Sequence, residues 1–501
     1  MGVDVIRLPV HFDLVMEPNY TGKIDDIVLE KLDQVCDWAE KYQIYLVIDN
    51  HSFNSETWAN NAPSIDYYKE HLNAVWTQVA QRYKDRSEYI IYEIVNEPMR
   101  NPEFLSKWVK VQQEIIDVIR TYDTKHTIVV TGADFSNIDT LVRMKPYKDP
   151  NLIYTFHFYE PFLFTHQGAA WMGKGMANTI DIPFPYDKSR MPKLNKTAAS
   201  DGWIQSMFNE YNQIGTVKYI NSRIKKVADW AKKNNARVWA GEIGAIYWAN
   251  PTDRIAWLKT TTSVLKEYNI PYCAWGIDSS DGFLKYRSRE SFPEDIEKEI
   301  LEAEGFSMPD ANLVAKTKIN AFPQKPYTVY DGLSGEKTGI ASAANCQTIK
   351  DDEPHEYCLK VPHIPAQSLH CKFLLPNSIS SKFAEYENSL AVCFSVKFTD
   401  KSQDINIFLQ DTDEGEANLP WRKVFTVKAS DYSLNKWVSV EIPISDFKNA
   451  HGTWSDKTQK WHNLECQFEW SRFHMLYFDF EDWDNKKKGD IYIDDVVIKQ
   501  K

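Results

Sequence analysis

The chain has 501 residues, a length that exceeds one ordinary hydrophobic core and predicts two domains. Its net charge of −12 at pH 7 argues against binding to nucleic acid or to an anionic membrane surface, because both require clustered Lys and Arg. Aromatic residues make up 14% of the chain, and this weakly favours a carbohydrate ligand, since Trp and Tyr faces suit sugar rings but also fill cores.

From the start to about residue 305, strand-like runs alternate with amphipathic helical segments. This alternation predicts a parallel sheet with crossover helices. No glycine-rich phosphate-binding loop follows a run, so an α/β fold of the (β/α)8 TIM-barrel type is favoured over an open doubly wound sheet. Seven runs are found, so the first βα unit of such a barrel is expected to be missing. The runs cover residues 3–10, 44–49, 89–95, 127–131, 152–157, 237–242 and 272–275, and the helices cover 27–41, 68–83, 102–122, 216–234, 253–268 and 293–302.

The helical pattern stops after residue 305. Residues 306–326 contain several Pro and turn-forming residues and are predicted to be a linker between a first domain, 1–305, and a second domain, 327–501. Short runs with a period of two then alternate with polar turns, which predicts an antiparallel β-sandwich. These runs cover residues 390–398, 405–410, 424–427, 437–442, 475–480 and 491–498.

Two glutamates stand at the downstream ends of strand-like runs. Glu97 closes the run that begins at residue 89, and Glu242 closes the run that begins at residue 236. Because the carboxyl ends of parallel strands share one face of the fold, both carboxylates are expected there. A pair of carboxyl groups is the minimum that hydrolysis of a glycosidic bond requires. The plainer alternative for Glu97 is an exposed carboxylate at a helix start, but the turn forced by Pro98 and the second glutamate favour catalysis.

Six other residues follow one another at predicted strand ends. They are Arg7 in Ile6-Arg7-Leu8-Pro9-Val10, His51 in Asp49-Asn50-His51, Asn96 in Asn96-Glu97-Pro98, His157 and Tyr159 in Phe156-His157-Phe158-Tyr159, and Trp275 in Ala274-Trp275-Gly276. With the two glutamates, this ordered set resembles glycoside hydrolase family 5, the retaining endo-β-glucanases and mannanases built on a (β/α)8 barrel. Each motif alone is weak, whereas the ordered set is specific and covers about residues 1–305.

The resemblance implies a retaining endo-β-1,4-glucanase in which Glu242 is the nucleophile and Glu97 is the proton donor and later the base. The charge of Glu242 is expected to raise the pKa of Glu97, so that Glu97 holds a proton. Arg7 and Tyr159 are expected to hold Glu242 oriented and ionised, although a purely structural salt bridge is the alternative for Arg7. The resemblance implies no cofactor, and no Cys/His spacing in the chain suggests a metal site.

The remaining matches imply substrate contacts. Asn96 is expected to bind the sugar 2-hydroxyl, or to close the turn before Pro98, or both. His51 and His157 are expected to donate to sugar hydroxyls, with packed structural histidines as the alternative. Trp275 is expected to stack on the sugar at the cleavage point, with a core tryptophan as its rival.

Weaker candidates lie in loops. A long insertion after the sixth predicted strand reaches about residue 214, and long loops at this face commonly build sugar subsites. Its candidates for sugar contacts are His166, Trp171 and Trp203, although they could equally seal the insertion against the barrel. The opposite wall of the cleft is expected to use Asp278, Ser279, Asp281 and Phe283.

The segment 489–498 resembles the last strand of sandwich carbohydrate-binding modules. Five tryptophans are enough to form an exposed sugar platform, although some of them must belong to the core: Trp421, Trp454, Trp461, Trp470 and Trp483. Asp494 and Asp495 could help to bind a structural calcium ion, although alternating polar residues at an edge are commoner. Five of the seven cysteines lie in this region, and some could pair in an oxidising compartment.

The sequence thus predicts a β-glucan-hydrolysing enzyme that is monomeric and that binds neither nucleic acid nor membrane. A secreted or periplasmic location is expected, even though no signal peptide precedes the first strand-like run. Two alternatives stay open. One is a β-mannanase or another β-glycanase of the same family, and the other is a polysaccharide-binding protein without catalysis.

Overall fold

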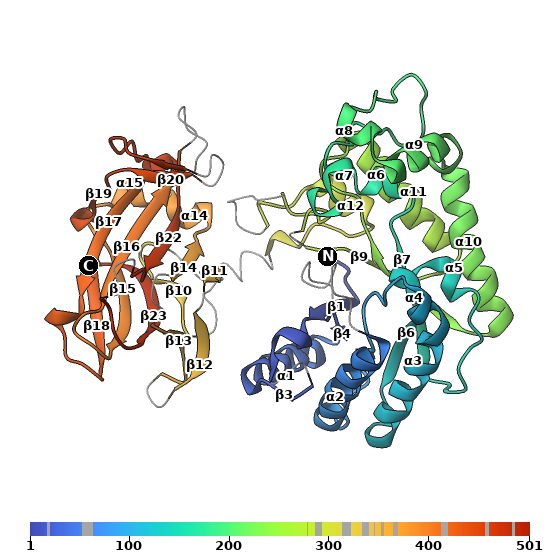
Figure 1. Cartoon of the computed structure of the whole chain (residues 1–501), viewed down its shortest axis with the longest axis horizontal. Helices are drawn as coiled ribbons and strands as arrows, with labels where there is room; N and C mark the ends of the chain where they lie inside the picture. Colours follow the sequence, from blue (N-terminus) through green and yellow to red (C-terminus); the bar gives the residue numbers. More distant parts are fainter. Residues whose placement is uncertain are drawn as a thin grey trace. The chain divides into compact units, whose positions relative to one another are not determined.

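The structure is a computed structural model (Figure 1). It describes residues 1–17, 21–52, 64–277, 279–285, 293–312, 322–332, 340–344, 346–351, 355–363, 369–411, 419–455, 460–482 and 486–501. Two compact units are present, one built mainly from residues 1–309 and the other mainly from residues 310–501. The described helices include none that is long and apolar enough to cross a membrane.

The first unit is built on a sheet of seven parallel strands (Figure 1). Strands that follow one another around the sheet are connected by helices, as the alternating pattern predicts. The two end strands of the sheet, β1 and β9, come into contact, so the sheet curves into a nearly closed barrel and the predicted (β/α)8-type fold is confirmed. In sheet order the strands are β1 (Val5–Val10), β4 (Tyr45–Asn50), β5 (Ile90–Glu93), β6 (Thr127–Thr131), β7 (Leu152–Phe158), β8 (Arg237–Ile243) and β9 (Tyr272–Ala274).

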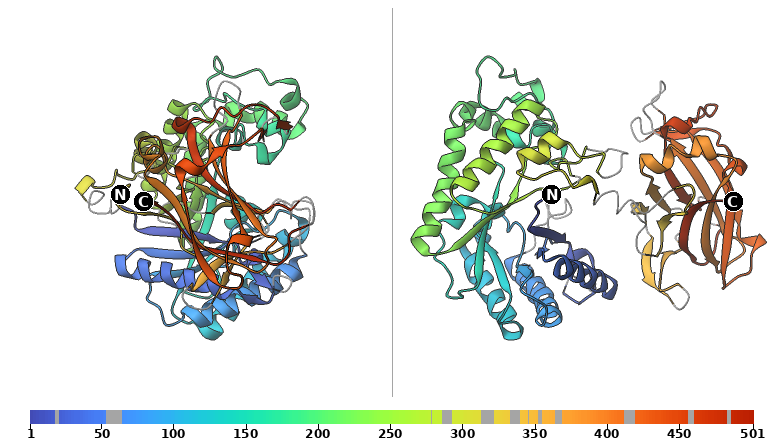
Figure 2. Two further views of the ribbon diagram at one scale, coloured as in Figure 1. Left: turned by 90° about the vertical axis from the view of Figure 1, so that its left-hand side faces the viewer. Right: turned by 180° about the vertical axis from the view of Figure 1, so that it is seen from behind.

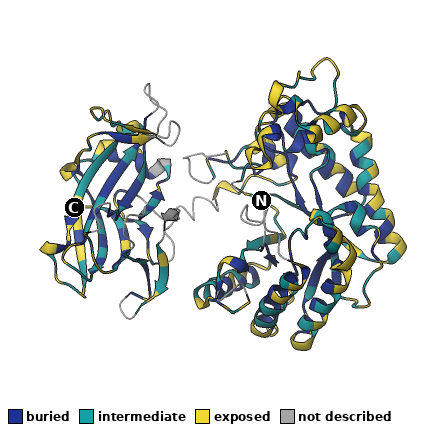
Figure 3. Cartoon of the chain, viewed as in Figure 1, coloured by how far each residue is buried: buried dark blue, intermediate teal, exposed yellow. Residues whose placement is uncertain are grey.

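Helices cover the outside of the barrel, with their outer faces exposed; the inner strands β4 to β8 are largely buried, while the end strands β1 and β9 are only partly buried (Figure 3). Polar residues begin five of them, because the side chains of Asp25, Ser64, Asn101, Thr216 and Asn250 accept hydrogen bonds from first-turn amides. The main helices are α1 (Asp26–Tyr42), α2 (Ile65–Tyr83), α3 (Pro102–Tyr122), α10 (Val217–Asn234), α11 (Pro251–Glu267) and α12 (Lys298–Ala303).

Short elements fill the loops of this unit. The insertion after β7 contains a 13-residue helix, α9, which the sequence pattern did not predict. Asp201 caps this helix by accepting from the amides of Trp203 and Ile204. The short elements are η1 (Phe12–Leu14), β2 (Met16–Glu17), β3 (Lys23–Ile24), α4 (Ala133–Ser136), α5 (Ile138–Leu141), α6 (Phe162–Thr165), η3 (Ala170–Met172), α7 (Lys174–Ala177), α8 (Lys196–Ala199) and α9 (Gly202–Ile214).

The second unit consists of two six-stranded antiparallel sheets, and the predicted sandwich is confirmed (Figure 2). Side chains from both sheets form one core, in which the rings of Phe394 and Phe478 lie 5.2 Å apart. One sheet contains β12 (Gln347–Lys350), β13 (Tyr357–Val361), β23 (Ile491–Gln500), β15 (Leu390–Phe398) and β18 (Trp437–Pro443), with β10 (Tyr327–Tyr330) beside β23. The other contains β11 (Ile340–Ala344), β14 (His370–Leu374), β22 (Phe473–Asp479), β16 (Asp404–Asp411), β17 (Arg422–Lys428) and β19 (Lys448–Asn449).

A hairpin and short helical segments complete this unit. They are β20 (Thr453–Ser455), β21 (Lys460–His462), α14 (Asn377–Ser380), α15 (Phe383–Tyr386), η4 (Ala429–Asp431), η5 (Ile444–Asp446) and η6 (Trp470–Arg472).

The structure separates the tryptophans of the predicted sugar platform into core and surface residues. Trp421 is only 1% exposed, and Trp470 packs against the core, so these two are among those that the prediction assigned to the core without naming them. Trp454 and Trp461 are exposed and face each other across the β20–β21 hairpin. Trp483 lies outside the described residues. No disulfide bond is found among the cysteines that the structure describes.

Candidate active site

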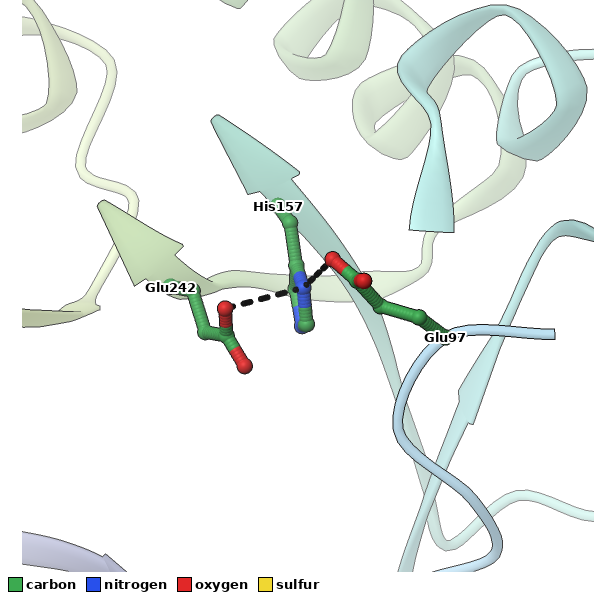
Figure 4. Close-up of side chains that lie close together, drawn as sticks. All are labelled: Glu97, His157 and Glu242. Atoms are coloured by element: carbon green, nitrogen blue, oxygen red, sulfur yellow. Dashed lines mark hydrogen bonds and ion pairs between the residues drawn. The ribbon is translucent and has the colours of Figure 1, made fainter. Parts of the chain in front are cut away.

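The two glutamates predicted to be catalytic meet at the carboxyl ends of the strands (Figure 4). Glu242 is the second-last residue of β8, while Glu97 lies in the segment that follows the end of β5. The chain after β5 is still tied to its neighbour, because the amide of Asn96 donates to the carbonyl of Asn50 at 3.0 Å. A carboxylate oxygen of Glu97 and one of Glu242 lie within 4.8 Å of each other.

Both carboxylate oxygens of Glu242 accept hydrogen bonds. Arg7 Nη1 donates to Oε1 at 2.8 Å, and the hydroxyl of Tyr159 donates to Oε2 at 2.7 Å. These donors stabilise the ionised form and fix the plane of the carboxylate. The residue before it, Gly241, allows close packing on β7, since a Cβ there would lie 2.4 Å from Thr155 Oγ1.

Glu97 differs in environment from Glu242. Its Oε1 lies 2.7 Å from His157 Nδ1, and its side chain is 24% exposed. Burial raises the pKa of Glu97 to about 7, while the positive charge of Arg7 acts in the opposite direction. The prediction that Glu97 has a raised pKa is therefore supported, but burial is its main cause and not the charge of Glu242.

His157, on β7, lies between the two glutamates (Figure 4). Its Nδ1 is 2.7 Å from Glu97 and 3.4 Å from Glu242 Oε2. Burial lowers the pKa of His157 to about 4, so the imidazole is neutral near pH 7 and adds no charge between the carboxylates.

A loop after β6 holds the turn that carries Glu97. The hydroxyl of Ser136 donates to the carbonyl of Asn96 at 2.8 Å, and the amide of Phe135 donates to the carbonyl of Pro98 at 2.8 Å. Asp134, Phe135 and Ser136 all have positive φ angles, between 56° and 64°, although none is a glycine. Such backbone conformations are unfavourable for non-glycine residues, and they occur here in direct contact with a proposed catalytic turn.

A buried charge network lies beneath Glu242. Arg7 donates to Glu93 through Nε at 2.7 Å and through Nη2 at 2.9 Å, and Asp49 Oδ2 lies 3.1 Å from the same Nη2. Burial opposes the charge of Arg7, but Asp49, Glu93 and Glu242 raise its pKa well above the ordinary value. Sequence reasoning missed Asp49 and Glu93. The signal available was an acidic residue inside each of two otherwise apolar strands.

A family model described as "Cellulase (glycosyl hydrolase family 5)" matches residues 1–281, more than half of the chain. The chain belongs to glycosyl hydrolase family 5. The resemblance inferred from the ordered motifs is thereby confirmed.

Relatives in family 5 share the barrel region. Endoglucanase 3 of Fibrobacter succinogenes is 32% identical over 294 residues, which make up 55% of this chain and 44% of that protein. This chain therefore spans less than half the length of that relative. Endoglucanase C of Acetivibrio thermocellus is 25% identical over 300 residues, or 59% of this chain and 86% of that one. The solved endoglucanase Cel5A of Thermotoga maritima is 27% identical, with a TM-score of 0.49, over 60% of this chain and 85% of that chain.

Trp275 stacks on His51. Their rings are parallel, with 5.4 Å between centroids and 6° between planes. Trp275 is half-buried and lies outside the hydrophobic core, so the alternative of a core tryptophan is not supported. His51 also lies beside Asn96 and Asp49, so it is both a cleft residue and part of the buried network.

The loop candidates separate into exposed and packed residues. Trp171 and Trp203 are about half exposed, at 53% and 47%, and stay candidates for sugar contacts. His166 stacks on Phe162 with 3.8 Å between ring centroids, which fits the alternative that it seals the insertion.

The opposite wall was predicted less well. Phe283 belongs to the core of the barrel unit, so its assignment to the cleft wall is wrong. Asp281 is buried, and burial raises its pKa to about 7. Ser279 accepts from the amides of Gly276 and Asp281, and Asp278 lies outside the described residues.

Within the described residues, two groups of three side chains could hold a metal ion. One is the cleft trio of Glu97, His157 and Glu242, for which the proposed chemistry needs no metal. The other joins His355 to Asp494 and Asp495, so the aspartates predicted for calcium have an imidazole as their third neighbour. Imidazole is an uncommon ligand for calcium, which prefers oxygen.

Proposed function

We propose that the protein is a retaining endo-acting β-1,4-glucanase that uses Glu242 as nucleophile and Glu97 as acid and base. The observation that carries the proposal is the placement of the two carboxylates, with oxygens within 4.8 Å of each other. Retaining glycosidases hold their two carboxyl groups about 5–5.5 Å apart, whereas inverting enzymes need about 6.5–9.5 Å to admit a water molecule.

In the first step, Glu242 attacks the anomeric carbon and forms a glycosyl ester as the bond to the leaving sugar breaks. Arg7 and Tyr159 keep the attacking carboxylate ionised and oriented. The proton of Glu97 passes to the leaving oxygen, which departs as a hydroxyl group. A pKa of about 7 for Glu97 keeps this proton available in weakly acidic solution.

In the second step, Glu97 is a carboxylate and removes a proton from water. The water oxygen attacks the anomeric carbon, and Glu242 leaves as a free carboxylate, so the β configuration is restored. Neutral His157 can donate its Nδ1–H to Glu97 at 2.7 Å, which stabilises the carboxylate form that this step requires.

The substrate part of the proposal is a β-glucan chain. Its support is the family and the relatives, which bear the name endoglucanase. Trp275 is only half-buried, and His51 supports one side of its ring, so the indole offers a face on which a glucosyl ring can stack. Because a polymeric glucan does not cross a membrane, we extend the proposal to a secreted or periplasmic enzyme, acting as a monomer.

The test is release of reducing sugar from carboxymethylcellulose, barley β-glucan, mannan and xyloglucan. We expect the wild type to cleave the glucans and Glu242→Ala to lose at least about 10⁴-fold in kcat. Glu103→Gln, an exposed carboxylate on α3 that pairs with Lys107, is the matched control and keeps full activity. Faster cleavage of mannan would favour the mannanase alternative. Binding without release from any substrate would support the non-catalytic alternative and overturn the proposal.

A second function is favoured by one face of the sandwich, which we propose binds β-glucan. On this face Phe408 and Tyr477 pair across β16 and β22, with 5.5 Å between ring centroids. The guanidinium of Arg422 lies 4.5 Å from the centroid of Phe408 and 5.5 Å from that of Trp461, whose side chain is 54% exposed.

Arg422 gives this face a donor that is not used elsewhere. Its Nε is buried without a hydrogen-bond partner among the described residues. A sugar can place its C–H face on Trp461 and its hydroxyl oxygens on the guanidinium.

Binding is measured with the full chain carrying Glu242→Ala, to prevent cleavage, by retention on insoluble cellulose and in gels that contain barley β-glucan. We expect Trp461→Ala to weaken retention about tenfold or more. Trp38→Ala, which removes a 51% exposed tryptophan from α1 of the barrel, is the control. Equal retention of the two variants would overturn the sandwich proposal and leave the catalytic one intact.

A further inference from the structure

Asn96 lies in a chain of hydrogen bonds whose direction can be deduced. Asn96 is 1% exposed, and its Oδ1 lies 2.8 Å from Arg7 Nη2. A guanidinium only donates hydrogen bonds, so the atom that faces it must be the amide oxygen and not the nitrogen. Glu93 fixes the guanidinium itself through two hydrogen bonds from Arg7.

The other side of the amide faces His51. Asn96 Nδ2 lies 3.4 Å from His51 Nε2, a long contact in which the amide nitrogen can only donate. His51 Nε2 must then be the acceptor and carry no hydrogen. Burial lowers the pKa of His51, so the ring is neutral and its single N–H is on Nδ1.

Among the described residues, the Nδ1–H of His51 has one hydrogen-bond partner. Asp49 Oδ2 lies 2.7 Å away, and Asp49 is completely buried. Burial raises the pKa of Asp49 to about 7, and the charge of Arg7, whose Nη2 lies 3.1 Å from the same Oδ2, acts against this rise and favours the carboxylate. The carboxylate form can only accept a hydrogen bond, so in this form Asp49 selects the tautomer with the hydrogen on Nδ1. If the other tautomer formed, the Nε2–H of His51 would face the amide N–H of Asn96, so that two donors would meet. Rotation of the amide by 180° would remove this conflict, but it would place the amide N–H against the guanidinium of Arg7, which is also a donor.

We propose that Asp49 is a positioning residue that acts through His51 to fix the orientation of the Asn96 amide. In that orientation one amide hydrogen points to His51 and the second is left as a donor for a substrate hydroxyl. The proposal rests on the proposed glycosidase function for its kinetic effect, but the tautomer of His51 is a property of the resting protein.

The kinetic test uses Asp49→Asn, which keeps the size of the side chain but can offer an N–H to His51. We expect kcat/KM on an aryl β-cellobioside to fall about 10–100-fold, the range found when an outer residue that orients a functional histidine is lost. The matched control is Asp123→Asn, because Asp123 and His126 form a similar buried pair, at 2.5 Å, next to the amino end of β6. Thermal unfolding of both variants reports the structural cost.

A double-mutant cycle with Asn96→Ala separates positioning from a general loss of structure. If Asp49 acts through Asn96, Asp49→Asn costs little once Asn96 has become Ala. Full additivity of the two losses would overturn the proposal, because Asp49 would then act through its ion pair with Arg7 or through stability.

Nitrogen-15 NMR of histidine-labelled protein tests the tautomer without activity. The His51 signals are assigned by their loss in His51→Gln. We expect hydrogen on Nδ1 in the wild type and in Asp123→Asn, and a shift toward Nε2–H in Asp49→Asn. Hydrogen on Nε2 in the wild type would overturn the positioning claim. If the wild type cleaves no glycan, the proposed function fails, while this spectrum still decides the role of Asp49.

Discussion

The two ends of the barrel interior are made from the same strands but have opposite chemistry. On β4, Val47 lies near the amino end and Asp49 follows two residues later. On β5, the corresponding pair is Ile91 and Glu93. Residues two apart in a strand face the same side of the sheet. The interior therefore changes from apolar to ionic within two residues along each of these strands.

The apolar end contains a small cluster separate from the main core, formed by Val47, Ile91, Val129 and Trp239. These side chains border a cavity of about 960 Å³. At the other end, the buried charges of Asp49, Glu93 and Glu242 are all paired with Arg7. The amino end of the barrel therefore supports the strands. The carboxyl end uses buried charge to set the protonation and orientation of the proposed catalytic groups.

Removal of Arg7 is expected to have the largest effect on the ionic end of the barrel. In Arg7→Met, three carboxylates lose their shared cation, and we expect the free energy of unfolding to fall by about 3–5 kcal/mol. We also expect kcat to fall at least about 10³-fold, because Glu242 loses a donor. Urea unfolding and cellobioside hydrolysis measure the two effects. A loss of less than about 1 kcal/mol would show that the network contributes little to stability.

The next largest effect is a dependence on pH at the ionic end. Glu97 must hold its proton in the first step, and its pKa is about 7, so kcat/KM should fall about tenfold per pH unit above pH 7. A dinitrophenyl cellobioside provides the control, since its leaving group needs no proton. The decline should vanish for its glycosylation step, and a decline that persists there would assign the titration to another group.

At the apolar end, Ile91→Ala should affect stability alone. Loss of this side chain enlarges an existing cavity, and we expect unfolding to become easier by about 2 kcal/mol. The kcat of the folded fraction should stay within about twofold of the wild type. A larger fall in kcat would contradict the separation of the two ends.

The smallest effect on stability is expected at a buried carboxylate that does not belong to the Arg7 network. Glu304 is fully buried after α12, and neither of its carboxylate oxygens has a hydrogen-bond partner among the described residues. Burial raises its pKa to about 8 from 4.5, so the folded state holds a proton that the unfolded state has lost between these values. Stability is therefore lost as pH rises through this window.

For Glu304→Gln we accordingly expect a higher melting temperature than wild type at pH 9, by the equivalent of about 1 kcal/mol or more, and little change at pH 4. Glu302→Gln, an exposed carboxylate on the same helix, should change neither. An equal shift at both pH values would mean that packing, and not ionisation, determines the effect.

Much of the barrel could be predicted from sequence because its strands are apolar runs of the expected length and its helices are amphipathic. The glutamates and most of the accompanying residues could be found because they stand at or near a strand end, whereas Arg7 lies in the middle of β1 and its predicted place at a strand end is wrong. The structure brings Arg7, His157 and Tyr159 to Glu97 or Glu242, and Asn96 to Arg7.

Other features lacked a local signal. The positive φ angles at Asp134, Phe135 and Ser136 occur without glycine, so only contact with the turn at Pro98 reveals them. Asp49 lies within the motif that contains His51, but its ion pair with Arg7 could not be predicted. The two residues belong to different strands, and the pairing depends on how these strands are arranged. Burial of Trp421 likewise depends on neighbours from other strands, since a tryptophan in a β-rich region is equally compatible with core and surface.

The most direct test of the account is the configuration of the first product. Proton NMR during hydrolysis of cellopentaose distinguishes the α and β anomers before they interconvert. Carboxylate oxygens within 4.8 Å predict that the β anomer forms first and the α anomer appears only later by mutarotation. Initial release of the α anomer would contradict the assignment of Glu242 as nucleophile.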